Sequence, residues 1–167
     1  MRLFIAITCI KETQSQLVKL QKQLATNAKG SFVDPKNFHL TLAFLGEQKI
    51  EKLPAIVEAI KATTTVPFTI NIEGIGTFGK GIWWAQVAPS DELHALHAQL
   101  QQELAKRNLP VDFRGFTAHI TLARNITGQK GPMIIKPFSQ RVSSISLMES
   151  KRVNGKLVYT ELYTHLW

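Results

Sequence analysis

The stretch His39-Leu40-Thr41-Leu42-Ala43 returns 80 positions later as His119-Ile120-Thr121-Leu122-Ala123. Polar and apolar residues alternate in both copies, which is the pattern of a β-strand. Because successive strand side chains point to opposite faces, the histidine and threonine of each copy share one face and the aliphatic residues share the other. We therefore expect two strands that bury their aliphatic side chains and present an imidazole beside a hydroxyl.

The match between the two halves of the chain extends beyond these strands. When the sequence is shifted by 80 positions, further apolar residues coincide: Leu3, Phe4 and Ile7 with Trp83, Trp84 and Val87, and Leu20 and Leu24 with Leu100 and Leu104. Each half then has the order strand, helix, loop and histidine strand. This repeat predicts two similar lobes about an approximate two-fold axis, within one domain that covers residues 1–167. If both histidine strands lie at the axis, their polar faces line one cleft.

Periodicity and turn residues predict the other elements. The expected helices cover about residues 11–28, 51–64 and 91–107, and the further strands cover about residues 3–8, 68–72, 82–87, 137–148 and 157–166. The glycines between positions 74 and 81 are assigned to a loop or hairpin, and Asn154-Gly155 predicts a hairpin turn. Ser90 or Asp91 is expected to cap the third helix.

The composition restricts the class of protein and partner. The 167-residue chain is 44% hydrophobic, enough for a core, and its formal net charge of +8 favours polyanionic partners. Cys9 is the only cysteine, which excludes an internal disulfide and a cysteine-based zinc site. A single cysteine suits a reducing cytoplasm, where we expect the protein to be. No segment has the length of a membrane span, and the apolar run of residues 3–10 predicts a first strand rather than a signal peptide.

Two histidines that face one cleft suit general acid–base catalysis. Imidazole titrates near neutral pH, so one ring can accept a proton while the other donates one. Opening a cyclic phosphodiester needs both acts, because one ring takes a proton from the attacking water and the other protonates the departing ribose oxygen. We expect the hydroxyls of Thr41 and Thr121, with Arg124, to hold the non-bridging phosphate oxygens. This chemistry requires no metal and no cofactor, and the approximate two-fold symmetry permits either order of acid and base.

The two motifs resemble the signature of the two-histidine (2H) phosphoesterases, a pair of His-x-Thr-x sequences. The first runs on from His39 to Gly46 and the second from His119 to Arg124. With the opening Arg2-Leu-Phe-Ile-Ala-Ile7, they resemble, over essentially the whole chain, the bacterial and archaeal RNA 2′,3′-cyclic phosphodiesterases, once called 2′-5′ RNA ligases. The resemblance implies an α+β hydrolase of two lobes, each an antiparallel sheet with helices on its outer face. It also implies that His39 donates a proton to the 3′ oxygen and that His119 accepts one from water, which leaves a 2′-phosphate.

Arg124 poses a geometric question. It lies five residues after His119, so strict alternation turns its side chain to the opposite face of the strand. Either the strand bends and returns the guanidinium to the phosphate, or Arg124 is a surface residue. Phe44 stands in the corresponding place of the first motif, so we expect the phosphate nearer to the far end of the second strand.

Several aromatic residues have two interpretations. Phe4, Trp83 and Trp84 could stack on a nucleobase, although their apolar strands favour packing in the core. Phe38 and Phe116 flank the histidine motifs and could line the cleft.

Charged and metal-binding candidates are similarly ambiguous. His94 and His97 are three residues apart on a predicted helix, a spacing that can bind a metal, but the sequence offers no third ligand and we predict no metal site. The C-terminal third is basic, and its charges could follow an RNA backbone or be solvated: Lys130, Lys136, Arg141, Lys151, Arg152 and Lys156.

Three functions compete at this stage. The leading hypothesis is hydrolysis of RNA or oligonucleotide 2′,3′-cyclic phosphate ends by a monomer. Ligation through a 2′-5′ bond is nearly the reverse reaction at the same site, and we expect it to be minor because no nucleotide cofactor drives it. A basic RNA-binding module without catalysis would not need histidine and threonine paired in both halves. The sequence leaves the natural RNA substrate open.

Overall fold

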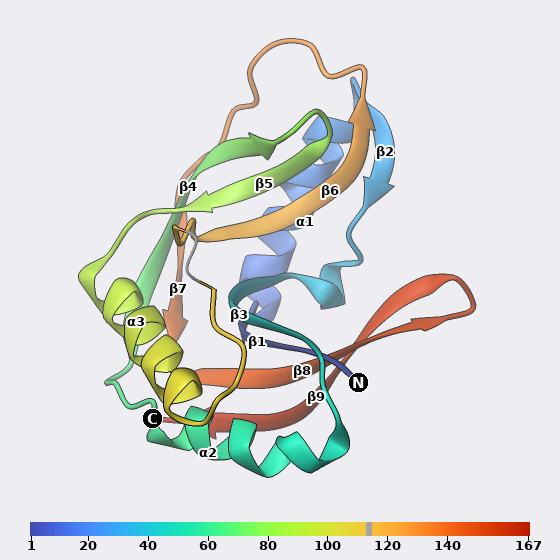
Figure 1. Ribbon diagram of the computed structural model, residues 1–167. Helices are drawn as coiled ribbons and strands as arrows, with labels where there is room; N and C mark the ends of the chain where they lie inside the picture. The colour runs from blue at the N-terminus through green and yellow to red at the C-terminus, as the bar shows by residue number, and fades with distance from the viewer. Residues whose placement is uncertain (113–114) are drawn as a thin grey trace.

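The computed structural model describes residues 1–112 and 115–167, and it confirms the α+β fold class (Figure 1). The helices of the described residues are α1 (Lys11–Ala25), α2 (Leu53–Ala62) and α3 (Asp91–Lys106), with short 3-10 turns η1 (Pro35–Asn37) and η2 (Ile50–Lys52). The strands are β1 (Arg2–Thr8), β2 (Lys29–Phe32), β3 (His39–Glu47), β4 (Phe68–Phe78), β5 (Ile82–Val87), β6 (His119–Thr127), β7 (Phe138–Val142), β8 (Ser144–Val153) and β9 (Lys156–Leu166).

The strands form two antiparallel groups that meet at one place. One group has the order β7-β4-β5-β6, with β2 also beside β6, and the other has the order β3-β1-β8-β9. Within the described residues, the pair Leu40 and Ile120 joins β3 to β6 and makes the whole sheet continuous. The two-lobed arrangement is therefore present, and the two histidine strands form the joint between the lobes.

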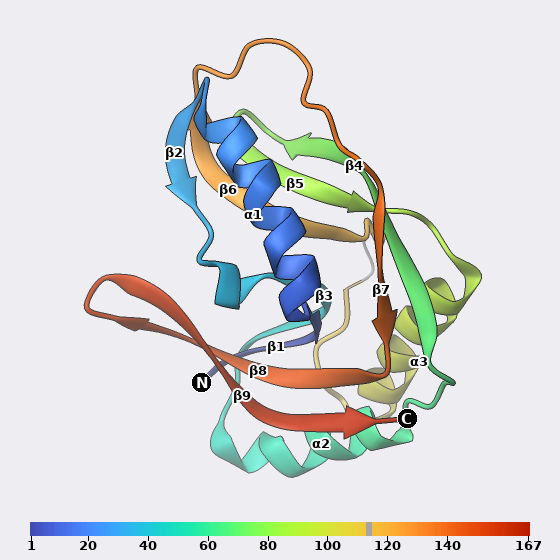
Figure 2. The same cartoon turned by 180° about the vertical axis from the view of Figure 1, so that it is seen from behind.

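The helices α1 and α3 are exchanged between the lobes. Helix α1, from the first half of the chain, contacts β6 and β7, whereas α3, from the second half, contacts β3 and α2. Figure 1 shows α1 behind β5 and β6, and Figure 2, from the opposite side, shows it in front of them; both views show α2 and α3 at the other lobe. The helices lie on the outer faces as expected, and through the exchange α1 and α3 each pack against the histidine strand from the other half of the chain.

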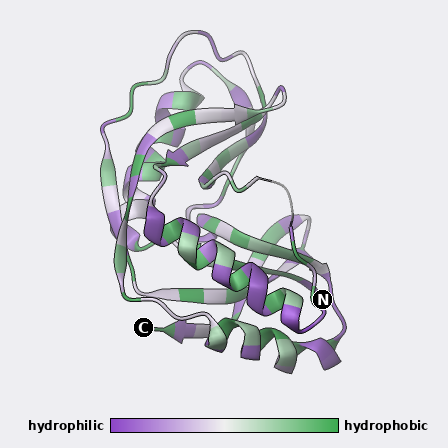
Figure 3. Ribbon diagram, turned by 60° about the vertical axis from the view of Figure 1, so that its left-hand side comes forward, coloured by the Kyte–Doolittle hydropathy of each residue, from purple (hydrophilic) through white to green (hydrophobic). Residues whose placement is uncertain are grey.

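Leucine stripes explain why these helices pack where they do. In α1, Leu17, Leu20 and Leu24 recur at helical spacing and are at most 6% exposed. In α3 the buried stripe is Leu93, Leu96, Leu100 and Leu104. Burying one such side chain contributes on the order of 2 kcal/mol by removing apolar surface from water. Figure 3 shows the resulting mixture of apolar and polar residues along each helix.

Two glycines lie inside a strand rather than in the predicted turn. Strand β4 continues through Gly74 and Gly76 to Phe78, and the turn to β5 is confined to residues 79–81. A Cβ atom at Gly76 would lie 2.2 Å from the indole ring of Trp84, so the glycine leaves space for this ring. The prediction was wrong because glycine permits close approach of a side chain as well as a turn.

Three other boundaries differ from the prediction. Helix α1 ends at Ala25 rather than near Ala28, and the following residues form β2, which the sequence did not predict. Strand β2 is exposed along its length, so it has no alternating pattern to reveal it. The predicted strand at 137–148 is two strands, β7 and β8, which belong to different lobes.

Turn and cap signals predicted their elements correctly. Asn154 and Gly155 have φ angles of 50° and 76°, as a tight hairpin between β8 and β9 requires. The Ser90 hydroxyl accepts a hydrogen bond from the Leu93 backbone N–H at 3.1 Å and caps α3. None of the helices in the described part of the chain has the length and hydropathy of a membrane span.

Candidate active site

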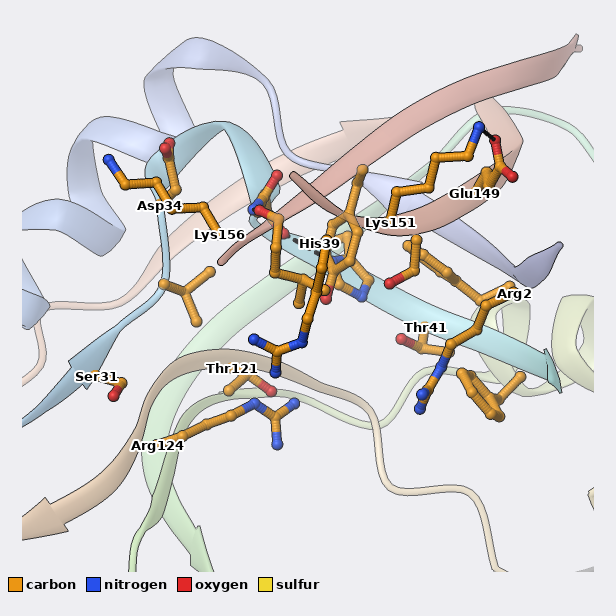
Figure 4. A pocket seen from close by; sticks show the side chains of 18 of the residues that line it. Arg2, Ser31, Asp34, His39, Thr41, Thr121, Arg124, Glu149, Lys151 and Lys156 are labelled. Atoms are coloured by element: carbon orange, nitrogen blue, oxygen red, sulfur yellow. Dashed lines mark hydrogen bonds and ion pairs between the residues drawn. The ribbon is translucent and has the colours of Figure 1, made fainter. Parts of the chain in front are cut away.

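The antiparallel joint between β3 and β6 brings the two motifs together. Because Leu40 pairs with Ile120, antiparallel geometry sets each histidine across from the threonine of the other motif. The two histidines are then diagonal neighbours on one face, a relation in which the residues lie about 7–8 Å apart and their Cβ atoms somewhat closer. Figure 4 shows His39, Thr41 and Thr121 beside one space. This separation leaves room for one phosphate group between the imidazoles.

A β-bulge in β6 determines which face of the strand the Arg124 side chain occupies. Leu122 has no partner on β5, because Trp83 pairs with Ala123 and Trp84 pairs with Thr121. The extra residue resets the alternation, and the side chain of Arg124 returns to the face of the histidine, where it lines the cleft (Figure 4).

Strand β3 contains the equivalent bulge. Leu42 is skipped because Ile5 pairs with Ala43 and Ala6 pairs with Thr41, so Phe44 also faces the cleft. Arginine and phenylalanine thus occupy matching places at opposite ends of the cleft, as the sequence alignment of the halves indicated.

Two glutamines hold these bulges from the opposite face. On α1, Gln21 Nε2 donates to the carbonyl oxygens of Leu122 and Val33, each at 2.8 Å. On α3, Gln101 Nε2 donates to the carbonyl oxygen of Leu42 at 3.2 Å. The glutamines are 80 positions apart, as are the two leucines. Each exchanged helix therefore fixes the bulge of the histidine strand that comes from the other half of the chain.

Each imidazole is oriented by the carbonyl oxygen two residues before it. His39 Nδ1 lies 2.7 Å from the Asn37 oxygen, and His119 Nδ1 lies 2.7 Å from the Thr117 oxygen. A carbonyl oxygen only accepts, so Nδ1 of each ring carries the proton. The Nε2 atom of each ring is then available as a proton acceptor when neutral and as a donor when protonated.

Aromatic rings surround both imidazoles. The ring of His39 lies 4.8 Å from that of Phe4 and 5.2 Å from that of Tyr159. The ring of His119 lies 4.9 Å from that of Phe78 and 5.6 Å from that of Trp84. Such walls restrict the rotation of the imidazoles and exclude water from their faces.

The surroundings of His39 favour its neutral form. Burial lowers the pKa of His39 below its usual value, and the positive charges of His119 and Arg124 lower it further. The hydrogen bond to the carbonyl oxygen of Asn37 acts in the opposite direction but is outweighed. A phosphate anion in the cleft would raise this pKa again, because an opposite charge favours the protonated ring.

The histidine face opens into a cleft of about 1640 Å³. Its charged lining residues are the cations Arg2, Arg124, Lys151, Arg152 and Lys156 and the acids Asp34, Glu47 and Glu149. All three carboxylates form ion pairs, with Lys36 at 3.5 Å, the N-terminal amine at 3.4 Å and Lys151 at 2.8 Å, in that order. The cleft therefore has an excess of positive charge for an anionic ligand.

The aromatic candidates are not brought into the cleft, with one exception. Phe38 is buried in the main core, and Phe116 stacks on His97 with ring centroids 4.0 Å apart. The lining of the cleft includes Phe4 but neither Trp83 nor Trp84. Phe4 is only 3% exposed, so its main contact is the imidazole beside it.

The two helical histidines take part in local contacts instead. His94 Nδ1 lies 2.8 Å from the Ser90 carbonyl oxygen, and His97 packs on Phe116. Over residues 1–112 and 115–167, no group of three or more histidine, cysteine, aspartate or glutamate side chains is placed to hold a metal ion.

Among the cleft residues that sequence reasoning missed are Arg2 and Tyr159. Arg2 lies with its guanidinium 5.1 Å from the centre of the Phe44 ring, at the end of the cleft opposite Arg124. Tyr159 reaches His39 from β9, 120 positions away in the chain. The repeat could not reveal either residue, because at the offset of 80 Arg2 coincides with Ile82 and Tyr159 coincides with Gly79.

Known proteins share this architecture. The crystal structure of Escherichia coli LigT in apo form is similar with a TM-score of 0.83 and 28% identity, covering 99% of this chain and 96% of LigT. A crystal structure of a phosphoesterase is similar with a TM-score of 0.85 and 29% identity, covering 99% and 97% of the two chains.

Sequence comparison gives the same relatives. An RNA 2′,3′-cyclic phosphodiesterase of Archaeoglobus fulgidus is 34% identical over 128 residues, which are 74% of this chain and 72% of the relative. One of Escherichia coli strain K12 is 29% identical over 166 residues, covering 96% and 93%. The family model for LigT like Phosphoesterase matches residues 7–84 and 86–159, nearly the whole chain. With its fold and sequence in agreement, the chain belongs to the LigT-like phosphoesterase family.

Proposed function

We propose that this chain hydrolyses RNA 2′,3′-cyclic phosphate ends to 2′-phosphomonoesters by metal-independent acid–base catalysis with His39 and His119. The observation that carries the proposal is the joint between β3 and β6, where two imidazoles with matching carbonyl partners share one cationic cleft. The relatives named as RNA 2′,3′-cyclic phosphodiesterases support the substrate class. Escherichia coli LigT has also been crystallised with 3′-AMP, a nucleotide monophosphate.

The phosphate is proposed to sit between the imidazoles. The hydroxyls of Thr41 and Thr121 donate to its non-bridging oxygens, one from each strand. The guanidinium of Arg124 adds charge at the His39 end of the cleft. Donors that are already in place when negative charge develops on phosphorus stabilise the transition state without reorganisation.

The proton transfers follow from the two Nε2 atoms. His119 accepts a proton from water as the water oxygen bonds to phosphorus, and His39 donates its Nε2 proton to O3′ as the P–O3′ bond breaks. The phosphate then remains on O2′. Burial and the nearby positive charges lower the pKa of His39 in the empty cleft, so a bound phosphate anion, which raises that pKa, supports its role as donor.

Product analysis tests this proposal. Incubation of 2′,3′-cyclic AMP with the protein in the presence of EDTA should give 2′-AMP, identified by ³¹P NMR. A 3′-AMP product would reverse the orientation of the ribose, and an equal mixture would show that the cleft does not orient it. Binding without turnover would favour the non-catalytic RNA-binding alternative. Loss of turnover in EDTA, restored by a divalent ion, would contradict the metal-independent mechanism.

A further inference from the structure

The hairpin of β8 and β9 forms an arm beside the cleft. We define the arm as residues 150–159, and Figures 1 and 2 show it extending away from the rest of the sheet. The arm lines the cleft with Ser150, Lys151 and Arg152 on one strand and with residues 155–157 and Tyr159 at the turn and on the other strand. No proposed catalytic step uses the end of this arm.

The arm carries cations that the protein itself does not neutralise. Lys151 is paired with the buried carboxylate of Glu149 at 2.8 Å. Within the described residues, neither Arg152 nor Lys156 has a carboxylate partner, and Arg152 Nη1 donates only to the Gly155 carbonyl oxygen at 3.3 Å. Two cations therefore project at the rim of a cleft that is proposed to bind an anion.

The end of the arm also exposes apolar side chains. Val153 is 50% exposed and Leu157 is 41% exposed, although both lie on a short, highly charged hairpin. Solvated charge alone does not account for apolar surface at this place. The combination of cations with apolar surface fits a ligand that has both phosphates and flat bases or riboses.

The arm is fixed relative to the candidate active site. Asn37 Nδ2 donates to the Leu157 carbonyl oxygen at 3.0 Å, while the Asn37 carbonyl oxygen orients His39. Tyr159 lies against His39, and Lys156 lies three residues before Tyr159, at the start of β9, about 10 Å away at the rise of a strand. The backbone of Lys156 is thus beyond the reacting phosphate but close enough to serve the next part of a nucleotide chain.

We propose that the arm binds the RNA chain on the 5′ side of the cyclic phosphate, with Arg152 and Lys156 contacting backbone phosphates. This inference rests on the proposed function, in which His39 faces the leaving O3′ atom and the ribose lies at the His39 end. The chain that continues from that ribose then meets the arm. The preferred substrate is therefore an oligoribonucleotide with a cyclic end rather than a cyclic mononucleotide, which has no upstream phosphodiester for the arm to hold.

The test compares two substrates and two double variants. The substrates are 2′,3′-cyclic AMP and a trinucleotide, ApApA, with a 2′,3′-cyclic phosphate end. The arm variant is Arg152→Ser/Lys156→Ser. The control is Lys19→Ser/Lys22→Ser on exposed positions of α1, which removes the same charge from residues that do not line the cleft. Far-UV circular dichroism confirms that each variant is folded.

The arm variant should lower kcat/KM for the trinucleotide by about tenfold at low salt, because two phosphate contacts are lost. Its kcat/KM for 2′,3′-cyclic AMP should fall by clearly less than its kcat/KM for the trinucleotide, because a mononucleotide has no upstream phosphodiester for Arg152 and Lys156 to contact. The slope of log kcat/KM against log salt for the trinucleotide should become shallower by about 1.4, the value for two contacts to a single strand. The control should change neither quantity.

The results separate this inference from the proposed function. If the wild-type protein does not open 2′,3′-cyclic AMP, the proposed function fails. If it opens both substrates equally well, or the arm variant loses activity equally on both, the arm does not bind RNA upstream of the cyclic end. Equal losses in the arm variant and the control would show a general effect of net charge and would also overturn the inference.

Discussion

The carbonyl oxygens of Asn37 and Thr117 decide which nitrogen of each imidazole can act. By accepting from Nδ1, each leaves Nε2 for the cleft, and the same arrangement occurs at both histidines. The two sites differ in their surroundings. At the first histidine, burial and the charges of His119 and Arg124 lower the pKa of His39.

The lowered pKa of His39 predicts how activity depends on pH. If His39 is the donor, it must be protonated to act. Activity is then lost as the pH rises through the pKa of His39, and a lowered pKa moves this loss to lower pH. The alkaline limb of kcat/KM, which reports the free enzyme, should therefore lie below about 6.5, the value for an unperturbed histidine. The corresponding limb of kcat should lie at higher pH, because bound phosphate raises the pKa. These limbs belong to the coupled pair. A kcat limb at or below that of kcat/KM would contradict the donor role.

Arg124 is predicted to stabilise the transition state through its fixed guanidinium. Arg124→Ala should lower kcat for 2′,3′-cyclic AMP by about 10²-fold, a typical loss for one such donor. Arg124→Lys should recover part of the loss, since it keeps the charge but not the fork of donors. Arg141→Ala, at an exposed arginine of β7, is the matched control. If the Arg124 and Arg141 variants behave alike, Arg124 is a surface residue.

At the scale of elements, the bulges in β3 and β6 determine which side chains of these strands face the cleft. Without Leu122 as an extra residue in β6, Arg124 would face the outer side with the leucines. Gln21 on α1 and Gln101 on α3 hold the bulge carbonyl oxygens of the two histidine strands. Gln21 thus influences the position of the Arg124 side chain through the backbone of Leu122.

Gln21 is therefore predicted to be a positioning residue. Gln21→Leu removes a donor from the carbonyl oxygens of Leu122 and Val33. The Leu122 oxygen keeps the backbone N–H of Val33 at 3.0 Å, whereas the Val33 oxygen loses its side-chain donor, at a cost of about 1–3 kcal/mol. The variant should have a lower melting temperature and a lower kcat, with KM less affected. Gln16→Leu, at an exposed position of α1, should change neither. A destabilised variant with wild-type kcat at a temperature where it is folded would limit Gln21 to a structural role.

The sequence predicted which face of the histidine strands most of the side chains occupy, and the exceptions have physical causes. Alternation placed Leu40 and Ile120 in the core and both threonines toward the cleft, because a buried face imposes a period of two. A bulge breaks this period without a signal in the residues themselves, so the face of Arg124 stayed open. The shift of 80 positions also misaligned the first strands, since Ala6 and Trp84, not Phe4 and Trp84, lie opposite the two threonines.

At the scale of the whole molecule, we propose that the chain is one bilobal domain whose halves are copies of one unit. The equal spacing of the histidines, bulges and glutamines supports this reading. The exchange of α1 and α3 could not be predicted, because a repeat in sequence gives the order of elements but not which copy of a sheet each helix covers. The main buried cluster accordingly contains residues from both halves.

The shared core predicts a single unfolding transition. Far-UV circular dichroism, tryptophan fluorescence and the reactivity of Cys9 should report the same midpoint in urea. Cys9 is a suitable probe because it is 7% exposed and burial raises the pKa of its thiol to about 12, which keeps it unreactive in the native state. Two separate transitions, or labelling of Cys9 before the loss of circular dichroism, would show that the lobes unfold independently.

The central claim is that two imidazoles in one cleft act as acid and base, and their removal tests it most directly. Turnover of 2′,3′-cyclic AMP in EDTA should fall by at least about 10²-fold in His39→Ala and in His119→Ala. The double variant should be little worse than either single one, because the two residues act as a unit. All three should keep the circular dichroism of the wild type. A folded single variant with near wild-type turnover would contradict the account.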